Sequence, residues 1–371
     1  MTPTAHDSSR RAPKVLALLV AVAALAAFAA APASATADDS DVLVFVPYAG
    51  QTFSIWRNGN LGTEAHVRTQ DTVAGDFSGA AGTDLFLYNS GTDPDGILHV
   101  APAPGGGYTS SFRSETINGL YTPVVGDFDG NAIDDILWYG KGTIPDSYWL
   151  FQVDGSHTTK TVTINGDYRV APINIDGDGD TDLIFYAPGS SADSIWVHTS
   201  GANHTTKAIT INGDYTLIAG HFSDVAEGSP QRRLYFWSKA GADSIWTFDT
   251  SGNHTSASMP NVDGSYEPVV GEFNSPYRDS VLFYKAGTGS ERLLSFNANG
   301  SVNQLEPPVV NGSYDPVVGD FDGNGYGDIA WATGGKATLW KFNGGGYTQA
   351  SVTTATPKTF PATIANYLFP A

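Results

Sequence analysis

The sequence contains no cysteine among its 371 residues, and it is poor in positive charge, with 19 Lys and Arg against 38 Asp and Glu. Without cysteine the chain cannot form disulfides, so its stability must come from core size, strand pairing or bound metal. The formal net charge of −19 repels phosphate backbones and argues against nucleic acid as a partner. The chain also lacks the G-x-S-x-G and H-E-x-x-H motifs of common hydrolases.

Long apolar runs are absent except for one near the N-terminus, from Val15 to about Ala31. It follows the basic residues Arg10, Arg11 and Lys14 and precedes an A-x-A sequence at 33–35. This order is typical of a secretory signal peptide. We therefore expect residues 1–35 to be removed, by the general or the twin-arginine export route. The mature protein is expected to be secreted, monomeric and without a membrane span.

Amphipathic helix patterns are missing from the rest of the chain, whereas turn residues are abundant, with 42 Gly and 21 Pro. Short runs rich in Val, Ile, Thr, Tyr, Phe and Trp recur between Gly, Asn and Asp. Such runs are typical of β-strands separated by tight turns. The sequence therefore predicts a single all-β domain over residues 36–371.

The strand-like runs belong to an internal repeat. Aligning the chain on the sequence G-D-F gives six equivalent positions, spaced 51, 47, 47, 51 and 48 residues apart: Gly75, Gly126, Ile173, Gly220, Gly271 and Gly319. Each repeat contains four strand-sized runs, enough for one four-stranded antiparallel sheet. A period in the forties with several short strands is the signature of a β-propeller blade.

The two ends of the mature chain each match part of a further repeat. Residues 41–47, "DVLVFVP", match the second strand of a blade, and residues 365–367 fall 46 residues after Gly319, at the position of G-D-F. Ring closure removes exposed sheet edges. We therefore expect a seven-bladed β-propeller of four-stranded antiparallel blades, the last blade being closed by N- and C-terminal strands.

The repeat carries an acidic loop, which is most complete in "GDFDGNGYGDIAW" at residues 319–331. Oxygen-bearing side chains stand at positions 1, 3, 5 and 9 of the loop, position 6 is Gly325, and position 7 offers a backbone carbonyl. Ca²⁺ takes six to eight oxygen ligands, and alternate side chains of a curved loop can converge on it. The predicted ligands are Asp320, Asp322, Asn324, Tyr326 and Asp328.

Two further loops share this pattern, each with three carboxylates and one amide at the side-chain positions. Loop 127–135 has Ala132 at position 6, where a β-carbon makes the turn costlier. Asp and Asn before Gly also form metal-free turns by bonding their own backbone. The repetition favours about three structural Ca²⁺ ions, and the remaining predicted ligands are Asp127, Asp129, Asn131, Ile133, Asp135, Asn174, Asp176, Asp178, Asp180 and Asp182.

The other three copies, loops 76–84, 221–229 and 272–280, have lost part of this ligand set. The unit G-D-F-D-G-[ND]-G-x-x-D-[IL], followed by an aromatic-rich strand, resembles the FG-GAP/VCBS repeat of the integrin α-subunit propeller and of secreted bacterial proteins. The resemblance covers about residues 41–371. It implies an integrin α-like propeller with calcium loops, and a function in adhesion, carbohydrate binding or, less often, catalysis.

The recurring aromatic and acidic residues outside the loops have alternative interpretations. Five Trp recur at one blade position, and three more lie on the preceding strand. These side chains can fill the space between blades or stack on sugars, and core packing is the favoured interpretation. His157, His204 and His254 share a hairpin register in which Tyr replaces His in other repeats, so we expect a structural position. Asp146, Asp193 and Asp243 recur before the Trp-bearing strand and are interpreted as turn residues.

The resulting functional hypothesis is a secreted calcium-binding propeller that acts as a non-catalytic binding or adhesion module. The favoured ligand is an extracellular glycan. The alternatives are a surface protein as partner, or a polysaccharide-active hydrolase or lyase. The acids that cluster in this sequence are already assigned to the loops, which leaves no evident carboxylate pair for glycoside hydrolysis.

Overall fold

The computed structural model describes residues 43–45, 52–57, 60–65, 71–79, 83–89, 95–103, 107–189, 192–223, 233–305, 309–333 and 336–353. The predicted signal peptide and the predicted closing strand at 365–367 lie outside these residues. All named elements are β-strands, as expected. Nowhere in the described ranges does a helix have the length and apolar character needed to cross a membrane.

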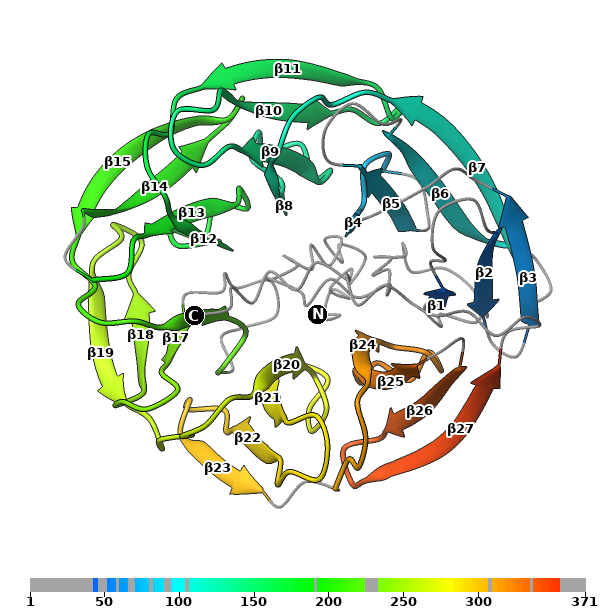
Figure 1. The fold of residues 1–371 in the computed structure, drawn as a ribbon. Coiled ribbons are helices and arrows are strands. Elements are labelled where there is room, and N and C mark those ends of the chain that lie inside the picture. Colours follow the sequence, from blue (N-terminus) through cyan, green and yellow to red (C-terminus); the bar gives the residue numbers. More distant parts are fainter. Residues whose placement is uncertain are drawn as a thin grey trace, which may run out of the picture.

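Six four-stranded antiparallel sheets follow one another along the chain and form the blades of a propeller (Figure 1). The first three blades contain β4 (Asp71–Gly75), β5 (Thr83–Tyr88), β6 (Asp95–Ala103) and β7 (Gly107–Glu115); β8 (Thr122–Gly126), β9 (Asp135–Tyr139), β10 (Asp146–Phe151) and β11 (His157–Val162); and β12 (Arg169–Ile173), β13 (Asp182–Tyr186), β14 (Asp193–Thr199) and β15 (Asn203–Ile209). The next three contain β16 (Thr216–Ala219), β17 (Arg233–Trp237), β18 (Ser244–Phe248) and β19 (His254–Ser258); β20 (Glu267–Gly271), β21 (Ser280–Tyr284), β22 (Arg292–Phe296) and β23 (Val302–Leu305); and β24 (Asp315–Gly319), β25 (Asp328–Thr333), β26 (Lys336–Phe342) and β27 (Tyr347–Thr353).

The prediction of seven four-stranded blades is wrong. The structure is a six-bladed propeller, and the remaining sheet has three strands: β1 (Leu43–Phe45), β2 (Thr52–Arg57) and β3 (Asn60–Ala65). This sheet lies in the ring between β4–β7 and β24–β27 (Figure 1). Its strands all come from the N-terminal part of the chain, so within the described residues no C-terminal strand completes it. Six innermost strands, β4, β8, β12, β16, β20 and β24, belong to complete blades, and among the described residues the three-stranded sheet has no strand of this kind.

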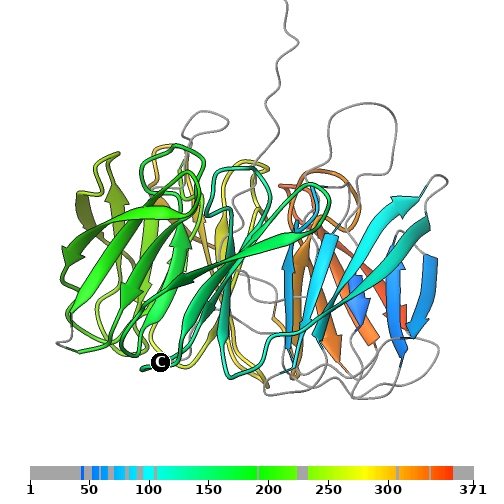
Figure 2. The same ribbon diagram turned by 90° about the horizontal axis from the view of Figure 1, so that it is seen from above.

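Burial within a blade is highest in the second strand and lowest at the rim. The second strands β9, β13 and β21 are buried at every residue, whereas the outermost strands β11, β19 and β23 are largely exposed. The first strand of each blade faces the centre, and the fourth forms the outer edge (Figure 1). Viewed from the side, the strands of each blade cross the thickness of the disc (Figure 2). Continuous apolar runs are therefore second strands, as expected for strands covered on both faces.

Aromatic side chains pack neighbouring blades together. The indole of Trp138 on β9 meets Phe86 and Tyr88 of the preceding blade, with ring centroids 5.0 and 5.3 Å away. Trp331 on β25 contacts Tyr284 in the same way, at 5.0 Å. These indoles are buried, so the prediction that the tryptophans form inter-blade core is confirmed for them. The side chain of Trp56 lies outside the described residues.

The histidines of the shared hairpin register stack on the recurring tryptophans. His157 lies parallel to Trp149 with centroids 4.0 Å apart, and His254 lies parallel to Trp246 at 3.6 Å. Tyr347 takes the same place against Trp340, at 4.5 Å. His and Tyr both present a flat ring to the indole at this position, whereas the same register in blade β20–β23 holds Val302.

Candidate metal centre

The acidic loops connect the first strand of a blade to the second and begin and end at a paired position. Gly126 pairs with Asp135 and Gly319 pairs with Asp328, so position 9 faces the residue before position 1 in these loops. This pairing closes each loop into a tight hairpin. In two of the loops this closure brings the carboxylates at positions 1, 3 and 9 together.

The aspartate at position 9 anchors each loop to the sheet. Asp328 is fully buried; one of its carboxylate oxygens accepts from the N–H of Phe321 at 2.9 Å and the other from the N–H of Phe342 at 2.7 Å. Asp135 and Asp182 make the equivalent pairs of bonds. A buried carboxylate is stabilised by such donors, and position 9 therefore ties the loop to the third strand.

The aspartate at position 1 organises the turn itself. Both oxygens of Asp320 accept backbone N–H groups, from Gly323 at 2.8 Å, Asn324 at 3.0 Å and Gly325 at 2.7 Å. Asp127 makes the same three bonds in its loop. Position 6 has a positive φ, 85° at Gly325 and 64° at Ala132, so the predicted strain at the alanine is present.

Two loops bring three carboxylates together. Asp127, Asp129 and Asp135 each offer an oxygen within 4.8 Å of the others, and so do Asp320, Asp322 and Asp328. Each oxygen has two lone pairs, so a carboxylate that accepts an N–H can still bind a cation. The donor set is therefore of the kind that Ca²⁺ takes, and the side chains present fit such an ion.

Loop 174–182 is arranged differently. Its acidic residues form no comparable group of three among the residues that the structure describes. Asn174 accepts from the N–H of Gly177, and Asp176 and Asp178 each accept a backbone N–H two residues further on. The pattern of oxygens at positions 1, 3, 5 and 9 is present in sequence, but position 1 is an amide here. Its side chains bond their own turn, as those of the other two loops also do.

Burial raises the pKa of the position 9 carboxyls. The pKa of Asp135 rises to about 9, that of Asp182 to about 8 and that of Asp328 to about 7, with burial as the largest cause and the neighbouring acids of each loop adding to it. Backbone N–H bonds oppose the shift. Without a cation these loops therefore hold protons near neutral pH, and a bound cation would have to displace them.

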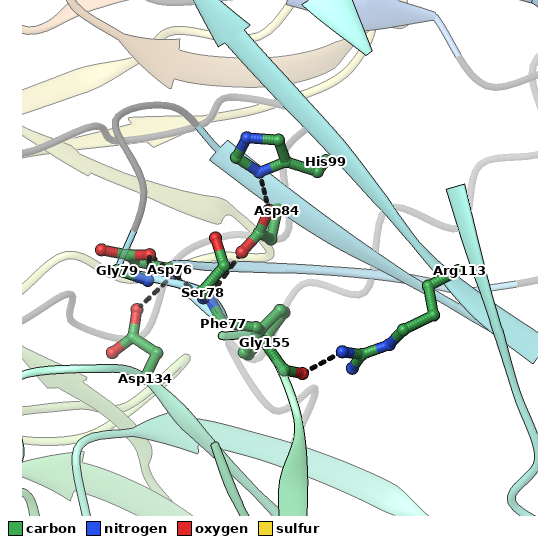
Figure 3. A network of polar contacts seen from close by, with 9 residues as sticks. All are labelled: Asp76, Phe77, Ser78, Gly79, Asp84, His99, Arg113, Asp134 and Gly155. Carbon is green, nitrogen blue, oxygen red and sulfur yellow. Dashed lines mark hydrogen bonds and ion pairs between the residues drawn. The ribbon is translucent and has the colours of Figure 1, made fainter. Parts of the chain in front are cut away.

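Loop 76–84, one of the degenerate copies, keeps the turn but not the cluster (Figure 3). Asp76 accepts from the N–H of Gly79 at 2.7 Å, and Asp84 accepts from the N–H of Phe77 at 2.8 Å. The second oxygen of Asp84 contacts Nδ1 of His99, and this contact raises the pKa of His99. The imidazole therefore contacts the Asp84 oxygen that corresponds to the one bonded by a third-strand N–H in loops 127–135, 174–182 and 320–328.

The loops of adjacent blades are linked to each other. In blade after blade, the N–H at position 8 donates to the carbonyl at position 1 of the preceding loop, as from Asp134 to Asp76 at 2.8 Å and from Thr181 to Asp127 at 2.5 Å. The Asp134 carboxylate also accepts from the Asp76 N–H at 2.9 Å, and Arg113 donates to the Gly155 carbonyl of the next blade (Figure 3). These links were not predicted from the sequence, although the position 8 acids of two loops, Asp134 and Asp279, were a visible signal.

The recurring aspartates before the third strand hold turns, as interpreted. Asp193 is buried and accepts from the N–H of Ala187 at 2.9 Å and from that of Ile211 at 2.7 Å. Asp146 and Asp243 make corresponding bonds. Each joins the end of its blade's second strand to the segment after the fourth.

Comparisons with known proteins support the fold. No protein-family model matches the chain, and no curated protein matches it. A crystal structure of a protein from Lactobacillus plantarum aligns over 86% of this chain and 97% of its own, with a TM-score of 0.55 and 11% identity. A functionally unknown protein from Desulfotomaculum acetoxidans aligns over 84% and 98%, with a TM-score of 0.51 and 9% identity.

A further match, the Tc holotoxin pore of Photorhabdus luminescens, has a TM-score of 0.45 at 13% identity and covers 86% of this chain and 17% of that one. The likenesses at 9 and 11% identity concern the fold alone and say nothing of its activity. The resemblance to the FG-GAP/VCBS repeat stays a prediction.

Proposed function

We propose that this protein is a secreted, non-catalytic β-propeller that binds Ca²⁺ through its acidic loops and serves as a binding module outside the cell. The observation that carries the proposal is the convergence of three carboxylates in each of two loops, 127–135 and 320–328. These loops fix the ends of inner strands, so a bound ion stabilises the ring through linkage.

Ca²⁺ fits these loops better than Mg²⁺. Mg²⁺ demands near-octahedral geometry and keeps several waters, whereas Ca²⁺ accepts flexible cages of protein oxygens. The proposal therefore includes a preference for calcium at both loops. Loop 174–182, which has an amide at position 1 and no comparable group of three carboxylates among the described residues, is expected to be the weakest of the three.

A protein partner is the second candidate for the bound ligand, beside an extracellular glycan. Sugar rings stack on exposed aromatic faces, but Trp138, Trp237 and Trp331 are buried between blades, and Trp149 and Trp340 are buried against neighbouring rings. This burial removes the main support for a glycan. Binding of the purified protein to a glycan array would favour the glycan. No signal on the array, together with binding to a purified surface protein, would favour the protein partner.

Calorimetric titration of the EDTA-treated full-length protein with CaCl₂ tests the cation proposal. We expect saturable binding at two or three sites, little response to MgCl₂ at the same concentration, and a rise in the melting temperature with calcium. Absence of heat and of any stabilisation at millimolar Ca²⁺ would overturn the proposal.

A further inference from the structure

The hairpin that joins β26 to β27 carries an Asn-Gly pair at the surface. Asn343 and Gly344 are both exposed, and Gly344 has a φ of 76°. A β-carbon at Gly344 would lie 2.7 Å from the hydroxyl of Tyr326, so the backbone conformation and the packing both require glycine at this position. The fold therefore places an unhindered peptide nitrogen directly after the side-chain amide of Asn343.

The backbone N–H of Gly344 has no hydrogen-bond partner among the residues that the structure describes. The N–H of Gly345 donates to Oδ1 of Asn343 at 3.1 Å, and the N–H of Asn343 donates to the carbonyl of Gly346 at 3.2 Å. The bonds that close the hairpin thus bypass Gly344. An exposed amide without an acceptor can lose its proton to solvent without any prior opening of the structure.

The corresponding hairpin of blade β20–β23 also contains an Asn-Gly pair, but this hairpin is one residue longer. There the N–H of Gly300 donates to the carbonyl of Asn297 at 2.7 Å. Oδ1 of Asn299 accepts from the N–H of Ser301 at 2.9 Å, which is the bond that Asn343 makes to the residue two positions on. The two asparagines therefore differ in whether the glycine N–H is held, and not in the bond made by the side chain.

Other Asn-Gly pairs of the described blades also restrain their glycine. The N–H of Gly325 donates to Oδ2 of Asp320 at 2.7 Å. The amide of Asn324 is fixed at both ends, by the N–H of Tyr326 and by the carbonyl of Phe342, each at 2.7 Å. The glycines of three further pairs are each paired with a second glycine in an isolated bridge: Gly166, Gly213 and Gly312. Gly344 has neither kind of restraint.

We propose that Asn343 is a site of intramolecular deamidation in the folded protein. The nitrogen of Gly344, after losing its proton to solvent, attacks Cγ of Asn343. The new C–N bond closes a succinimide ring, the Cγ–Nδ2 bond breaks, and Nδ2 takes up a proton and leaves as ammonia. The N–H of Gly345 points at the oxygen on which negative charge develops, and this donor stabilises the intermediate. Water then adds to either imide carbonyl and opens the ring to aspartate or to isoaspartate.

The two products should affect the hairpin differently. In blade β16–β19 the first residue of the same hairpin is Asp249, which accepts the N–H groups of Ser251 and Asn253 at 2.9 Å each, so a carboxylate is compatible with this position. The isoaspartate product inserts a methylene into the backbone beside Phe342. Both the N–H and the carbonyl of Phe342 bond loop 320–328, so this product should loosen the loop. The modification itself does not depend on the proposed calcium sites.

Incubation of the purified full-length protein in heavy-oxygen water at mildly alkaline pH tests the site. Opening of the imide incorporates the label, so mass spectrometry of peptides produced in ordinary water reports only the conversion that took place in the folded protein. Because a held N–H must first be released, we expect the Asn343 peptide to be labelled roughly tenfold faster or more than the peptides of Asn299 and Asn324. Equal rates, or faster conversion at Asn299, would overturn the proposal.

Two controls separate the fold from the local sequence and establish the cyclic intermediate. In urea the three Asn-Gly pairs should convert at similar rates, and a preference for Asn343 that persists there would refute the structural argument. Asn343→Gln keeps a side-chain amide but is too long to close the same ring with Gly344, so this variant should lose the label at this position. Labelling of Asn343→Gln at the wild-type rate would indicate direct hydrolysis of the amide and would also overturn the proposal.

Discussion

Asp322 and Asp328 belong to the same carboxylate cluster but should respond very differently to substitution. Asp328 is buried and holds two backbone N–H groups, whereas Asp322 is exposed and, among the described residues, has no hydrogen-bond partner. Asp328→Ala leaves two buried donors unpaired, which should lower the free energy of unfolding in EDTA by about 2–5 kcal/mol. Asp322→Ala should change that free energy by no more than about 0.5 kcal/mol.

In the presence of calcium, Asp322→Ala should become destabilising. At a free calcium concentration of about 100 times Kd, each occupied site adds about 2.7 kcal/mol to the free energy of unfolding. Asp322→Ala should lose that amount from the calcium-dependent gain and keep the gain of the other loop. Urea unfolding with and without CaCl₂, combined with a count of bound ions, measures both quantities. The reasoning fails if Asp322→Ala retains the full gain, or if it destabilises the calcium-free protein as much as Asp328→Ala does.

Three further predictions concern the turns and the dependence on pH. Asp193→Ala should cost about 2–5 kcal/mol in urea unfolding because two buried N–H groups lose their acceptor, while the exposed Asp214→Ala should cost little; equal losses would contradict the turn role. Burial lowers the pKa of His198 to about 3, so this side chain stays neutral in the folded protein, and the free energy of unfolding should fall by up to about 1.4 kcal/mol per pH unit between about pH 6.5 and pH 3. Replacing His198 by Phe and its hydrogen-bond partner Tyr148 by Leu should reduce this slope in urea unfolding. An unchanged slope would assign the acid sensitivity to other groups. The pKa of Asp328, raised to about 7, means that calcium binding must release a proton below that pH, so calcium affinity measured by calorimetry should be higher at pH 8 than at pH 6, and a pH-independent affinity would exclude this carboxyl as a ligand.

The repeat, the strand content and the turn chemistry could be predicted from the sequence because they depend on short-range spacing. A positive φ at position 6 and an acceptor at position 1 are properties of nine consecutive residues, and Ala132 and Asp320 behave as that spacing requires. The same holds for the aspartates that precede the third strands. Their bonds to backbone N–H groups recur because each blade repeats the same local geometry.

The number of complete blades could not be read from spacing alone. The end segments match parts of a blade in sequence, but a match of strand-sized runs does not establish that they pair. In the described residues β1–β3 forms a three-stranded sheet without a C-terminal member. Pairing between distant segments depends on how the ring is assembled, and no local pattern reports it.

What the sequence alone determined, then, is the all-β repeat and the oxygen-rich loops, since hydrophobic periodicity and turn residues act over a few positions. Only the tertiary structure decided which oxygens meet. It gathers three carboxylates in loops 127–135 and 320–328, forms no such group in loop 174–182 among the described residues, and places Asp180 beside Gly130 of the neighbouring blade. The physical reason is that each blade docks on its neighbour through packed aromatic side chains and backbone bonds between loops, and this docking sets where side chains from different repeats point.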